Sequence, residues 1–494
     1  MSYRSKLSDE IKSYFEVLEP DFPKWLEDYI ETPAMARSAY ISNNCGMVYT
    51  KMTNSDFFLS NLDHSVAVAL VVWHFTHDKS QTLAGLFHDI ATPVFKHCVD
   101  VMNGDVITQE SLENLTSDFI KSSPEIMKLL SRDGIKLDEV DDYHIYPIAD
   151  NDSPRLAADR LEYSLSNALF LYDKCNLDEI RELYTDIEIE NNEDNLPELG
   201  FKTKKSARKF VKITCEMSII YRDERPRFSM QFIADVLKGL SSEGKLVKQD
   251  LFEKKESEII AVIEKSRYAE VFNKWRNATK VLKSEEKPDD VYFVKTGSKV
   301  RYIDPLVKGE RISKVCKIAK GYIAKNLAYD MDDYLYLGFK MPKSELENFL
   351  IKAKQATYAN RNSKYQKSSR LNSKDYEFND GNLTYHDTYF GSNSFIGEEI
   401  VYRNDKPIWG MNYHGSTTAP DLAEEIFDEV LRPALAKVDE ASTLPARAPE
   451  LFIKDEYIYS FVTNGNLDNF SGTETITKDG KEIYKLKCHG GKIE

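Results

Sequence analysis

The sequence predicts a mostly α-helical N-terminal domain, residues 1–340, followed by a smaller α+β domain, residues 341–494. Three observations predict this fold class. A long apolar helical pattern near residue 65 carries several histidines, amphipathic helical faces continue over 203–282, and the last part of the chain repeats a strand–turn–strand motif. A chain of 494 residues is long enough for two or three domains with separate cores.

The stretch from residue 61 to residue 100 holds five of the nine histidines. Residues 65–75 are apolar nearly all round, so we expect a buried helix there. Residues 81–87 predict a second apolar helix that ends at His88-Asp89. Pro93 then breaks the helical pattern, because proline lacks an N–H donor and clashes with the preceding turn.

The segments on either side of this stretch are also expected to be helical. Residues 1–36 predict short amphipathic helices, and 108–147 predict a broken helical region. Ser153 is a good N-cap and Pro154 suits the first helical position, so a further helix is predicted over 154–175.

Past this helix the pattern becomes mixed. The acidic run in 176–196 predicts a solvated loop or insertion. A polar hinge at 284–290 precedes an alternating pattern around Gly297, which predicts a hairpin over 291–307. With the helix and the strand that follow, we interpret 291–340 as a small α/β flap on the N-terminal domain.

Residues 341–494 begin with an amphipathic helix and then contain an internal repeat. Segment 395–415 aligns without a gap with 470–490, matching Phe, Gly, Glu, Lys, Ile, an aromatic residue, His and Gly. Turn residues fall at the middle of both segments, so each unit predicts a β-hairpin. The helix expected over 421–438 should cover one face of a joint sheet.

The matched pairs Glu399/Glu474 and His414/His489 allow two interpretations. In the simpler one, which we prefer, a duplicated hairpin repeats its geometry. In the other, the four side chains form a shared ligand site on a pseudo-twofold axis. This part of the chain also resembles an uncharacterised bacterial domain, a likeness that implies a separate fold and no function.

Four side chains predict a metal site. His64 starts the first apolar helix, and His88-Asp89 ends the second. Asp159 supplies a fourth ligand, because a carboxylate one to two turns inside an apolar helix is costly unless it is paired or metal-bound. Two imidazoles and two carboxylates suit one divalent ion (Mn, Fe, Co, Ni, Zn or Mg). The alternative is a buried His/Asp network without metal.

The order His, His-Asp, Asp, with HDIATPVFKHCVD at the end of the second helix and DRLEY at Asp159, resembles the HD-domain phosphohydrolases. Within them it is most similar to the deoxynucleoside triphosphate (dNTP) triphosphohydrolase branch. The resemblance implies a complete metal-ligand set: His64, His88, Asp89 and Asp159. It also implies that His97 and Asp100 belong to the catalytic machinery, and residues three apart share one helix face.

Three positions depart from that branch. Thr92 stands where the branch usually has a histidine, and Asn61 stands where an arginine usually contacts phosphate. Near Gln109-Glu110 a further catalytic histidine is missing. Metal binding and phosphoester hydrolysis are compatible with these changes, whereas they weigh against the release of triphosphate.

The resemblance implies a metal-dependent phosphohydrolase acting on a nucleotide, with a dNTP triphosphohydrolase as the narrower expectation. Two alternatives stay open: an HD-type nucleotidase or cyclic-nucleotide phosphodiesterase, and a non-catalytic nucleotide sensor whose C-terminal domain binds a partner. The candidate substrate-binding residues are Arg37, Arg160 and Tyr163. Arg37 either faces a phosphate or is a surface arginine. Tyr163 lies four residues after Asp159 on the same face, where it either packs against a base or sugar or belongs to the core.

Composition sets the remaining expectations. The net charge of -15 argues against nucleic-acid binding, which depends on phosphate neutralisation. The six cysteines are dispersed without a CxxC pair, and the N-terminus lacks the apolar core of a signal peptide, so we expect a cytoplasmic protein without membrane contact. The expected partner is a nucleotide or another phosphorylated small molecule, and a homo-oligomer is compatible with these features.

Overall fold

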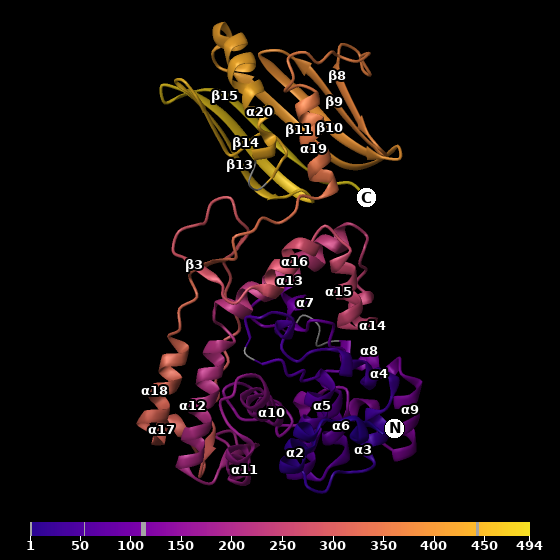
Figure 1. Ribbon diagram of the computed structural model, residues 1–494, viewed down its shortest axis with the longest axis vertical. Coiled ribbons are helices and arrows are strands. Elements are labelled where there is room, and N and C mark those ends of the chain that lie inside the picture. The colour runs from indigo at the N-terminus through magenta and orange to yellow at the C-terminus, as the bar shows by residue number, and fades with distance from the viewer. Residues whose placement is uncertain (1, 54, 110–114, 441–443) are drawn as a thin grey trace. The chain divides into compact units, whose positions relative to one another are not determined.

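The computed structural model describes residues 2–53, 55–109, 115–440 and 444–494. The chain divides into two compact units, Met1–Met341 and Pro342–Glu494. The first is largely helical and the second is built on an eight-stranded sheet (Figure 1). The expected layout of a helical part followed by an α+β part is therefore confirmed. No helix in the described parts of the chain combines the length and the apolar character that a membrane crossing requires.

The N-terminal unit is built from helices of four to nineteen residues that pack into two apolar cores. Its α-helices are α1 (Tyr3–Lys6), α2 (Asp9–Leu18), α3 (Leu26–Ile30), α4 (Pro33–Ala36), α5 (Asn61–Thr76), α6 (Lys79–Phe87), α7 (His97–Met102), α8 (Thr116–Lys121), α9 (Pro124–Asp133), α10 (Ala158–Ser166), α11 (Leu177–Thr185), α12 (Lys204–Ile220), α13 (Glu224–Ser242), α14 (Asp250–Glu253), α15 (Glu256–Glu264), α16 (Ala269–Asn277), α17 (Ile312–Val315) and α18 (Lys317–Leu327). Shorter turns are η1 (Arg37–Tyr40), η2 (Met47–Tyr49), η4 (Leu137–Glu139) and η5 (Tyr143–Ile145), with a π-helical turn η6 (Asn167–Leu171) after α10.

Helices α5 and α6 form an antiparallel pair that places two histidines at the same end. Ser60 caps α5 in a reciprocal capping box with Asp63, and His77 ends the helix in a left-handed conformation. Gly85 of α6 lies against α5 so closely that a Cβ atom there would meet a Val72 methyl group at 3.2 Å. Because the connection is short, the first turn of α5 and the end of α6 lie together.

Helix α10 begins later than its sequence predicts. Ser153 and Pro154 do not start the helix, because the backbone that follows them bonds to other segments. Leu156 N–H donates to Glu198 Oε1 (3.1 Å) and Ala158 N–H donates to the Ile148 carbonyl oxygen (2.8 Å). Asp159 therefore lies in the first turn of α10, rather than one to two turns inside it.

Two small sheets complete the N-terminal unit and correct two expectations. One has the order β1-β2-β5-β6 and the other the order β3-β7-β4. Their strands are β1 (Ile187–Asn191), β2 (Pro197–Phe201), β3 (Leu282–Ser284), β4 (Phe293–Val294), β5 (Leu306–Val307), β6 (Glu310–Arg311) and β7 (Tyr334–Tyr336). The acidic run in 176–196 thus contains a strand, in which Ile187 is buried and Ile189 is exposed. The 291–340 segment is not a separate flap with its own hairpin, since β4 and β5 belong to different sheets and β5 pairs with β2.

The C-terminal unit is one antiparallel sheet in the order β12-β13-β14-β15-β11-β10-β9-β8, with helices across one face (Figure 1). The strands are β8 (Lys374–Asp380), β9 (Leu383–Gly391), β10 (Ser394–Arg403), β11 (Lys406–Thr417), β12 (Leu451–Lys454), β13 (Tyr457–Asn466), β14 (Asn469–Lys478) and β15 (Lys481–Lys492). The helical elements are α19 (Glu345–Ala356), η7 (Pro420–Leu422), the π-helical η8 (Glu425–Leu431), α20 (Arg432–Ala436) and η9 (Val438–Glu440). Leu350 of α19, Leu435 of α20 and Trp409 of the sheet share one apolar core.

The sequence-matched segments form the hairpins β10–β11 and β14–β15. Each hairpin has a register shift at the matched place, Val401/Tyr402 in the first and Ile476/Thr477 in the second. The buried Glu399 and Glu474 lie on the helix-covered face, whereas the exposed His414 and His489 occupy alternate strand positions on the other face. A ligand site that combines these histidines with the glutamates is therefore wrong.

Candidate active site

The structure brings the four predicted metal ligands together. His64 Nε2 lies 3.2 Å from Asp159 Oδ1 and 3.9 Å from Asp89 Oδ2. His88 Nε2 lies 3.7 Å from each of the same two oxygens. His64, His88 and Asp89 also offer ligand atoms that all lie within 4.8 Å of one another. Atoms about 2.1 Å from a common ion are separated by roughly 3.0–3.4 Å, so small adjustments suffice for this donor set to hold one divalent cation.

The outer nitrogens of both histidines are already bound. His64 Nδ1 contacts a carboxylate oxygen of Glu162, which is fully buried and also accepts from the Tyr14 hydroxyl (3.2 Å). His88 Nδ1 bonds to the Gly85 carbonyl oxygen at 2.8 Å. Such acceptors fix the ring orientation and leave Nε2 for a metal. Glu162 is a positioning residue that sequence reasoning missed, although its place three residues after Asp159 was a usable signal.

The cluster carries an excess of negative charge. Asp89, Asp159 and Glu162 face two imidazoles, and Lys96 is the one lysine among the described residues that contacts them, with its Nζ 2.9 Å from Asp89 Oδ2. Burial alone would lower the pKa of His64, yet the Glu162 and Asp159 carboxylates raise it to about 10. Burial would raise the pKa of Asp89, but Lys96 and the two histidines hold it well below its usual range. A cation at the centre therefore suits the electrostatics.

His97 and Asp100 form a pair at the edge of the same site. His97 starts α7, and its Nδ1 lies 2.9 Å from Asp100 Oδ2, which leaves Nε2 as its second nitrogen. His97 lines the cavity described below, while Asp100 is buried behind it. Burial lowers the pKa of His97, so the neutral imidazole is favoured. This arrangement suits an acid or base held in one tautomer.

The turn between His88-Asp89 and His97 has unusual backbone geometry. Phe95 has φ 60° and Lys96 has φ 45°, a region that side-chain-bearing residues rarely adopt. Glu256, fully buried, accepts from the Phe95 N–H (2.9 Å) and from the Tyr49 hydroxyl (2.7 Å). Lys96 Nζ donates to three acceptors, and such over-determination is what keeps a strained turn in place.

Replacement of Glu256 by alanine is expected to destabilise the chain and disturb this turn. Two buried donors lose their acceptor, at a cost of about 1–3 kcal/mol each. Glu256→Gln keeps an acceptor and should recover part of the loss, while Glu253→Ala on the exposed side of α14 should change little. Urea unfolding at constant pH measures all three variants. A Glu256→Ala chain as stable as the wild type would contradict this role.

Arg37 does not line the cavity. Its guanidinium donates to the carbonyl oxygens of Ile90 (3.2 Å) and Thr92 (2.7 Å), which ties η1 to the turn after Asp89. Two of its nitrogens are buried without a partner among the described residues. The structure therefore places Arg37 in contact with the turn after Asp89, and its contact with substrate stays a prediction.

A cavity of about 490 Å³ opens beside the four predicted metal ligands and contains both other predicted substrate contacts. Arg160 lines it, but its guanidinium is engaged by Asp150 (2.8 Å) and Asn151 (3.2 Å). Tyr163 also lines it, and burial raises the pKa of its hydroxyl to about 12. Its neutral ring is thus available for packing against a bound molecule.

Two cationic residues of the cavity were not predicted. Lys96 donates to Asn43 Oδ1 and Asn61 Oδ1, both at 2.7 Å, in addition to its contact with Asp89. Arg301 donates to Gln109 Oε1 (2.8 Å) and makes no ion pair with any residue that the structure describes. The run of Lys299, Val300 and Arg301 after Gly297 was a signal for a basic loop, but only the fold brings this loop to the cavity that the predicted metal ligands line.

The positions that depart from the HD pattern have structural uses here. Asn61 is buried, accepts from Lys96 and donates weakly to the Asp89 carbonyl oxygen (3.4 Å). Thr92 offers its carbonyl oxygen to Arg37. Gln109 binds Arg301, and Glu110 lies outside the described residues. Lys96, in the turn after Asp89, therefore contacts position 61, where the resemblance implied an arginine.

Comparison with known proteins gives three findings. A family model described as "Domain of unknown function (DUF5680)" matches residues 387–493. The uncharacterized protein YdhJ from Bacillus subtilis (strain 168) is 24% identical over 259 residues, which are 52% of this chain and 76% of that protein. The crystal structure of a phosphohydrolase from Bacteroides thetaiotaomicron VPI-5482 superposes with a TM-score of 0.43 at 14% identity, covering 63% of this chain and 95% of the other.

Proposed function

We propose that the N-terminal unit is an HD-type, metal-dependent phosphohydrolase that cleaves a phosphoester or phosphoanhydride in a nucleotide-sized molecule. The observation that carries this proposal is the convergence of His64, His88, Asp89 and Asp159 beside a cavity lined by His97. A divalent ion held by these four side chains supplies Lewis-acid stabilisation of phosphoryl charge. A cavity of about 490 Å³ is within the range of small-molecule sites.

Other residues of the cavity transfer the proton and bind the substrate. His97, neutral and oriented by Asp100, can take or give a proton at its Nε2 atom. Lys96 and Arg301 supply positive charge for phosphate oxygens, and among the described residues the Arg301 guanidinium contacts only Gln109, which leaves it suited to a bidentate contact. Tyr163 and Tyr221 offer aromatic surface for a base or sugar.

Within this class, Asn61 and Gln109 favour an HD-type nucleotidase or cyclic-nucleotide phosphodiesterase over a dNTP triphosphohydrolase. Asn61 accepts a hydrogen bond from Lys96, and Gln109 accepts one from Arg301. Neither side chain can therefore contact a triphosphate in the way that the arginine and the histidine of that branch would. A nucleotide sensor without turnover is the alternative from another class, because the same cavity would also bind a nucleotide.

A substrate panel tests the proposed reaction. The full chain, stripped of metal and then supplied with Mn²⁺, Mg²⁺, Co²⁺, Ni²⁺, Zn²⁺ or Fe²⁺, is incubated with nucleoside mono-, di- and triphosphates, cyclic nucleotides and p-nitrophenyl phosphates. Release of phosphate, pyrophosphate or tripolyphosphate is measured. We expect metal-dependent release from at least one class. Saturable nucleotide binding without any turnover would instead support the sensor.

Arg301→Met is expected to weaken substrate use without affecting metal content. A charge-assisted contact to phosphate contributes about 1.5–3 kcal/mol, so kcat/KM should fall by roughly 10- to 100-fold on the best panel substrate. Arg181→Met is the matched control, because Arg181 is exposed and, within the part of the chain that the structure describes, its only ion pair is with Asp178. An unchanged kcat/KM in Arg301→Met would remove this residue from the phosphate site.

A further inference from the structure

The C-terminal unit contains a cavity of its own, separate from the metal ligands. It measures about 340 Å³ and lies between the helix-covered face of strands β9–β11 and the helical elements α19, η8 and α20. Its walls are rich in aromatic side chains: Tyr358, Tyr385, Tyr389, Phe395, Tyr413 and Phe427. In the matched segments of the second half, the core residues Phe461 and Cys488 pack closely against Gly472.

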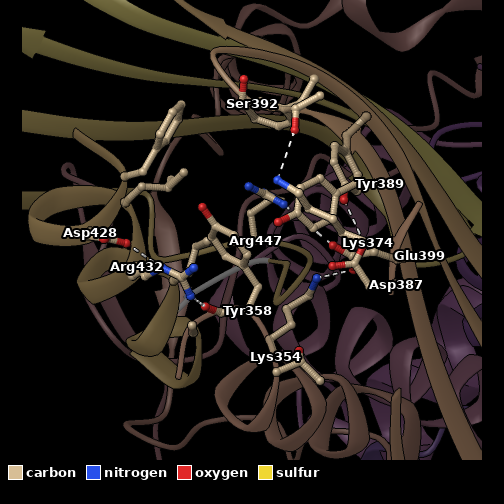
Figure 2. A pocket seen from close by; sticks show the side chains of 18 of the residues that line it. Lys354, Tyr358, Lys374, Asp387, Tyr389, Ser392, Glu399, Asp428, Arg432 and Arg447 are labelled. Atoms are coloured by element: carbon tan, nitrogen blue, oxygen red, sulfur yellow. Dashed lines mark hydrogen bonds and ion pairs between the residues drawn. The ribbon is translucent and has the colours of Figure 1, made fainter. Parts of the chain in front are cut away.

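Most charges around this cavity are paired with each other. Lys354 contacts Glu399, and Arg432 contacts Asp428 at 2.8 Å (Figure 2). Arg447 lies between Glu474 (2.9 Å) and Glu399 (3.6 Å). Glu474 also accepts from the hydroxyls of Tyr459 and Tyr484, both at 2.8 Å. The lysine and arginines that line the inner wall are therefore already neutralised.

Asp387 is the exception. It lines the cavity beside Glu399 and is 4% exposed (Figure 2). Its Oδ1 accepts from the Tyr413 hydroxyl at 2.7 Å, while Oδ2 has no hydrogen-bond partner and the carboxylate no ion pair among the described residues. Counted together, Asp387, Glu399 and Glu474 are three carboxylates against the two cations Lys354 and Arg447. Burying an unpaired carboxylate is costly unless something compensates it.

The internal repeat argues that the fold does not require this carboxylate. Asp387 lies opposite Glu399 in the β9–β10 register, and Phe461 lies opposite Glu474 in the β13–β14 register. Tyr385 and Tyr459, two residues earlier on each strand, correspond in the same way. An apolar residue therefore fits the matched place, and the first half of the unit carries a carboxylate where the second half carries a core phenylalanine.

We propose that this cavity binds a small organic cation with an aromatic body, whose amidinium or ammonium group pairs with Asp387. Lys354, Lys374, Arg432 and Arg447 already lie over the tyrosine rings of the wall, so the planar body of the ligand would stack on Phe395 or Phe427 while its charged end pairs with Asp387. A ligand charge of +1 balances the inner cluster, and a cavity of about 340 Å³ is large enough for a compact molecule. Lys374, partly exposed at the rim above the Tyr389 ring, restricts the cationic end to the interior.

The charge state of Asp387 gives the site a pH dependence. Burial and the neighbouring Glu399 carboxylate raise the pKa of Asp387 to about 7, despite the Tyr413 hydrogen bond. The titratable groups that face it are Glu399, Tyr385, Tyr413, Lys354 and Arg447. Because only the ionised carboxylate pairs with a cation, binding should be stronger at pH 8 than at pH 6, by about tenfold.

Benzamidinium, neutral benzamide and benzoate are matched probes, since they share one shape and differ in charge. Each is titrated into the full chain by isothermal calorimetry at pH 8. We expect saturable binding of benzamidinium, binding of benzamide at least tenfold weaker, and no binding of benzoate. Asp387→Asn should weaken benzamidinium binding at least tenfold, and Tyr389→Leu should weaken it to a lesser degree.

Three results would overturn the proposal: equal affinity for benzamide and benzamidinium, unchanged benzamidinium binding by Asp387→Asn, or no saturable binding to the wild type at about 10 mM probe. Melting curves separate binding from folding. Because the pKa of Asp387 is about 7 in the folded chain and about 3.9 in the unfolded chain, its ionisation lowers stability progressively between about pH 4 and 7, and the loss is complete above pH 7. Asp387→Asn should therefore raise the melting temperature, more at pH 8 than at pH 5, and a lower melting temperature would make Asp387 a structural residue instead.

Discussion

Replacement of Asp89 by alanine is expected to abolish both metal binding and phosphate release. Asp89 Oδ2 lies within 3.9 Å of both histidine Nε2 atoms and also accepts from Lys96. Its loss removes one ligand and leaves the Lys96 ammonium directed at the site, which repels a cation. Because a metal typically contributes several kcal/mol to phosphoryl transfer, turnover should fall by on the order of 10³-fold or more.

Elemental analysis and the substrate panel measure the two effects in Asp89→Ala. Asp178→Ala is the matched control, since this carboxylate is 88% exposed and lies far along the chain on α11. Chelation should lower the melting temperature of the wild type and of the control but not that of Asp89→Ala, because only a folded site binds the ion. A full complement of metal in Asp89→Ala would show that the ligand set is wrong.

His97→Ala is expected to separate metal binding from chemistry. His97 is bonded to Asp100 and is not needed to hold the ion in the proposed site, so metal content and melting temperature should stay near wild type. Loss of a positioned acid or base lowers the rate by on the order of 10²–10⁴. Asp100→Asn retains an oxygen that can accept from His97 Nδ1, so its loss should be smaller.

The pH dependence offers a second test of His97. Burial lowers its pKa, so the neutral imidazole persists below pH 6.5. If His97 acts as a base, the acidic limb of the kcat/KM profile should lie below pH 6.5 in the wild type and should disappear in His97→Ala. Near-normal turnover of His97→Ala on the best substrate would exclude the proposed role.

Those parts of the candidate site that a local sequence pattern marks could be predicted. His64 and His88-Asp89 stand at the ends of two apolar helices, and a helical hairpin must bring those ends together. Asp159 was predicted from an assumed position inside a helix, although it actually lies in the first turn of α10. Glu256 was missed because its contact joins elements far apart in the sequence and leaves no periodic signal. Glu162 and Arg301 had local signals, but their partners His64 and Gln109 are also distant in the sequence, so their roles could not be predicted.

The same limit applies to the fold. Helices with a continuous apolar face and hairpins with turn residues were predictable, as α5, α6 and the pairs β10–β11 and β14–β15 illustrate. The strands β4 and β5 are two residues long, and each finds its partner in a different sheet. Strand pairing of this kind depends on long-range packing, which the alternation of side chains over a few residues does not specify.

A metal titration tests the proposed function most directly. The full chain is freed of metal with a chelator, and Mn²⁺ is added in steps while bound ion and phosphate release from the best panel substrate are measured on the same samples. We predict release that rises in proportion to bound metal and saturates at about one ion per chain, with Asp159→Asn binding and releasing far less. Full phosphate release by the metal-free chain would contradict a metal-dependent phosphohydrolase built on His64, His88, Asp89 and Asp159. So would an Asp159→Asn chain that binds Mn²⁺ and releases phosphate as the wild type does.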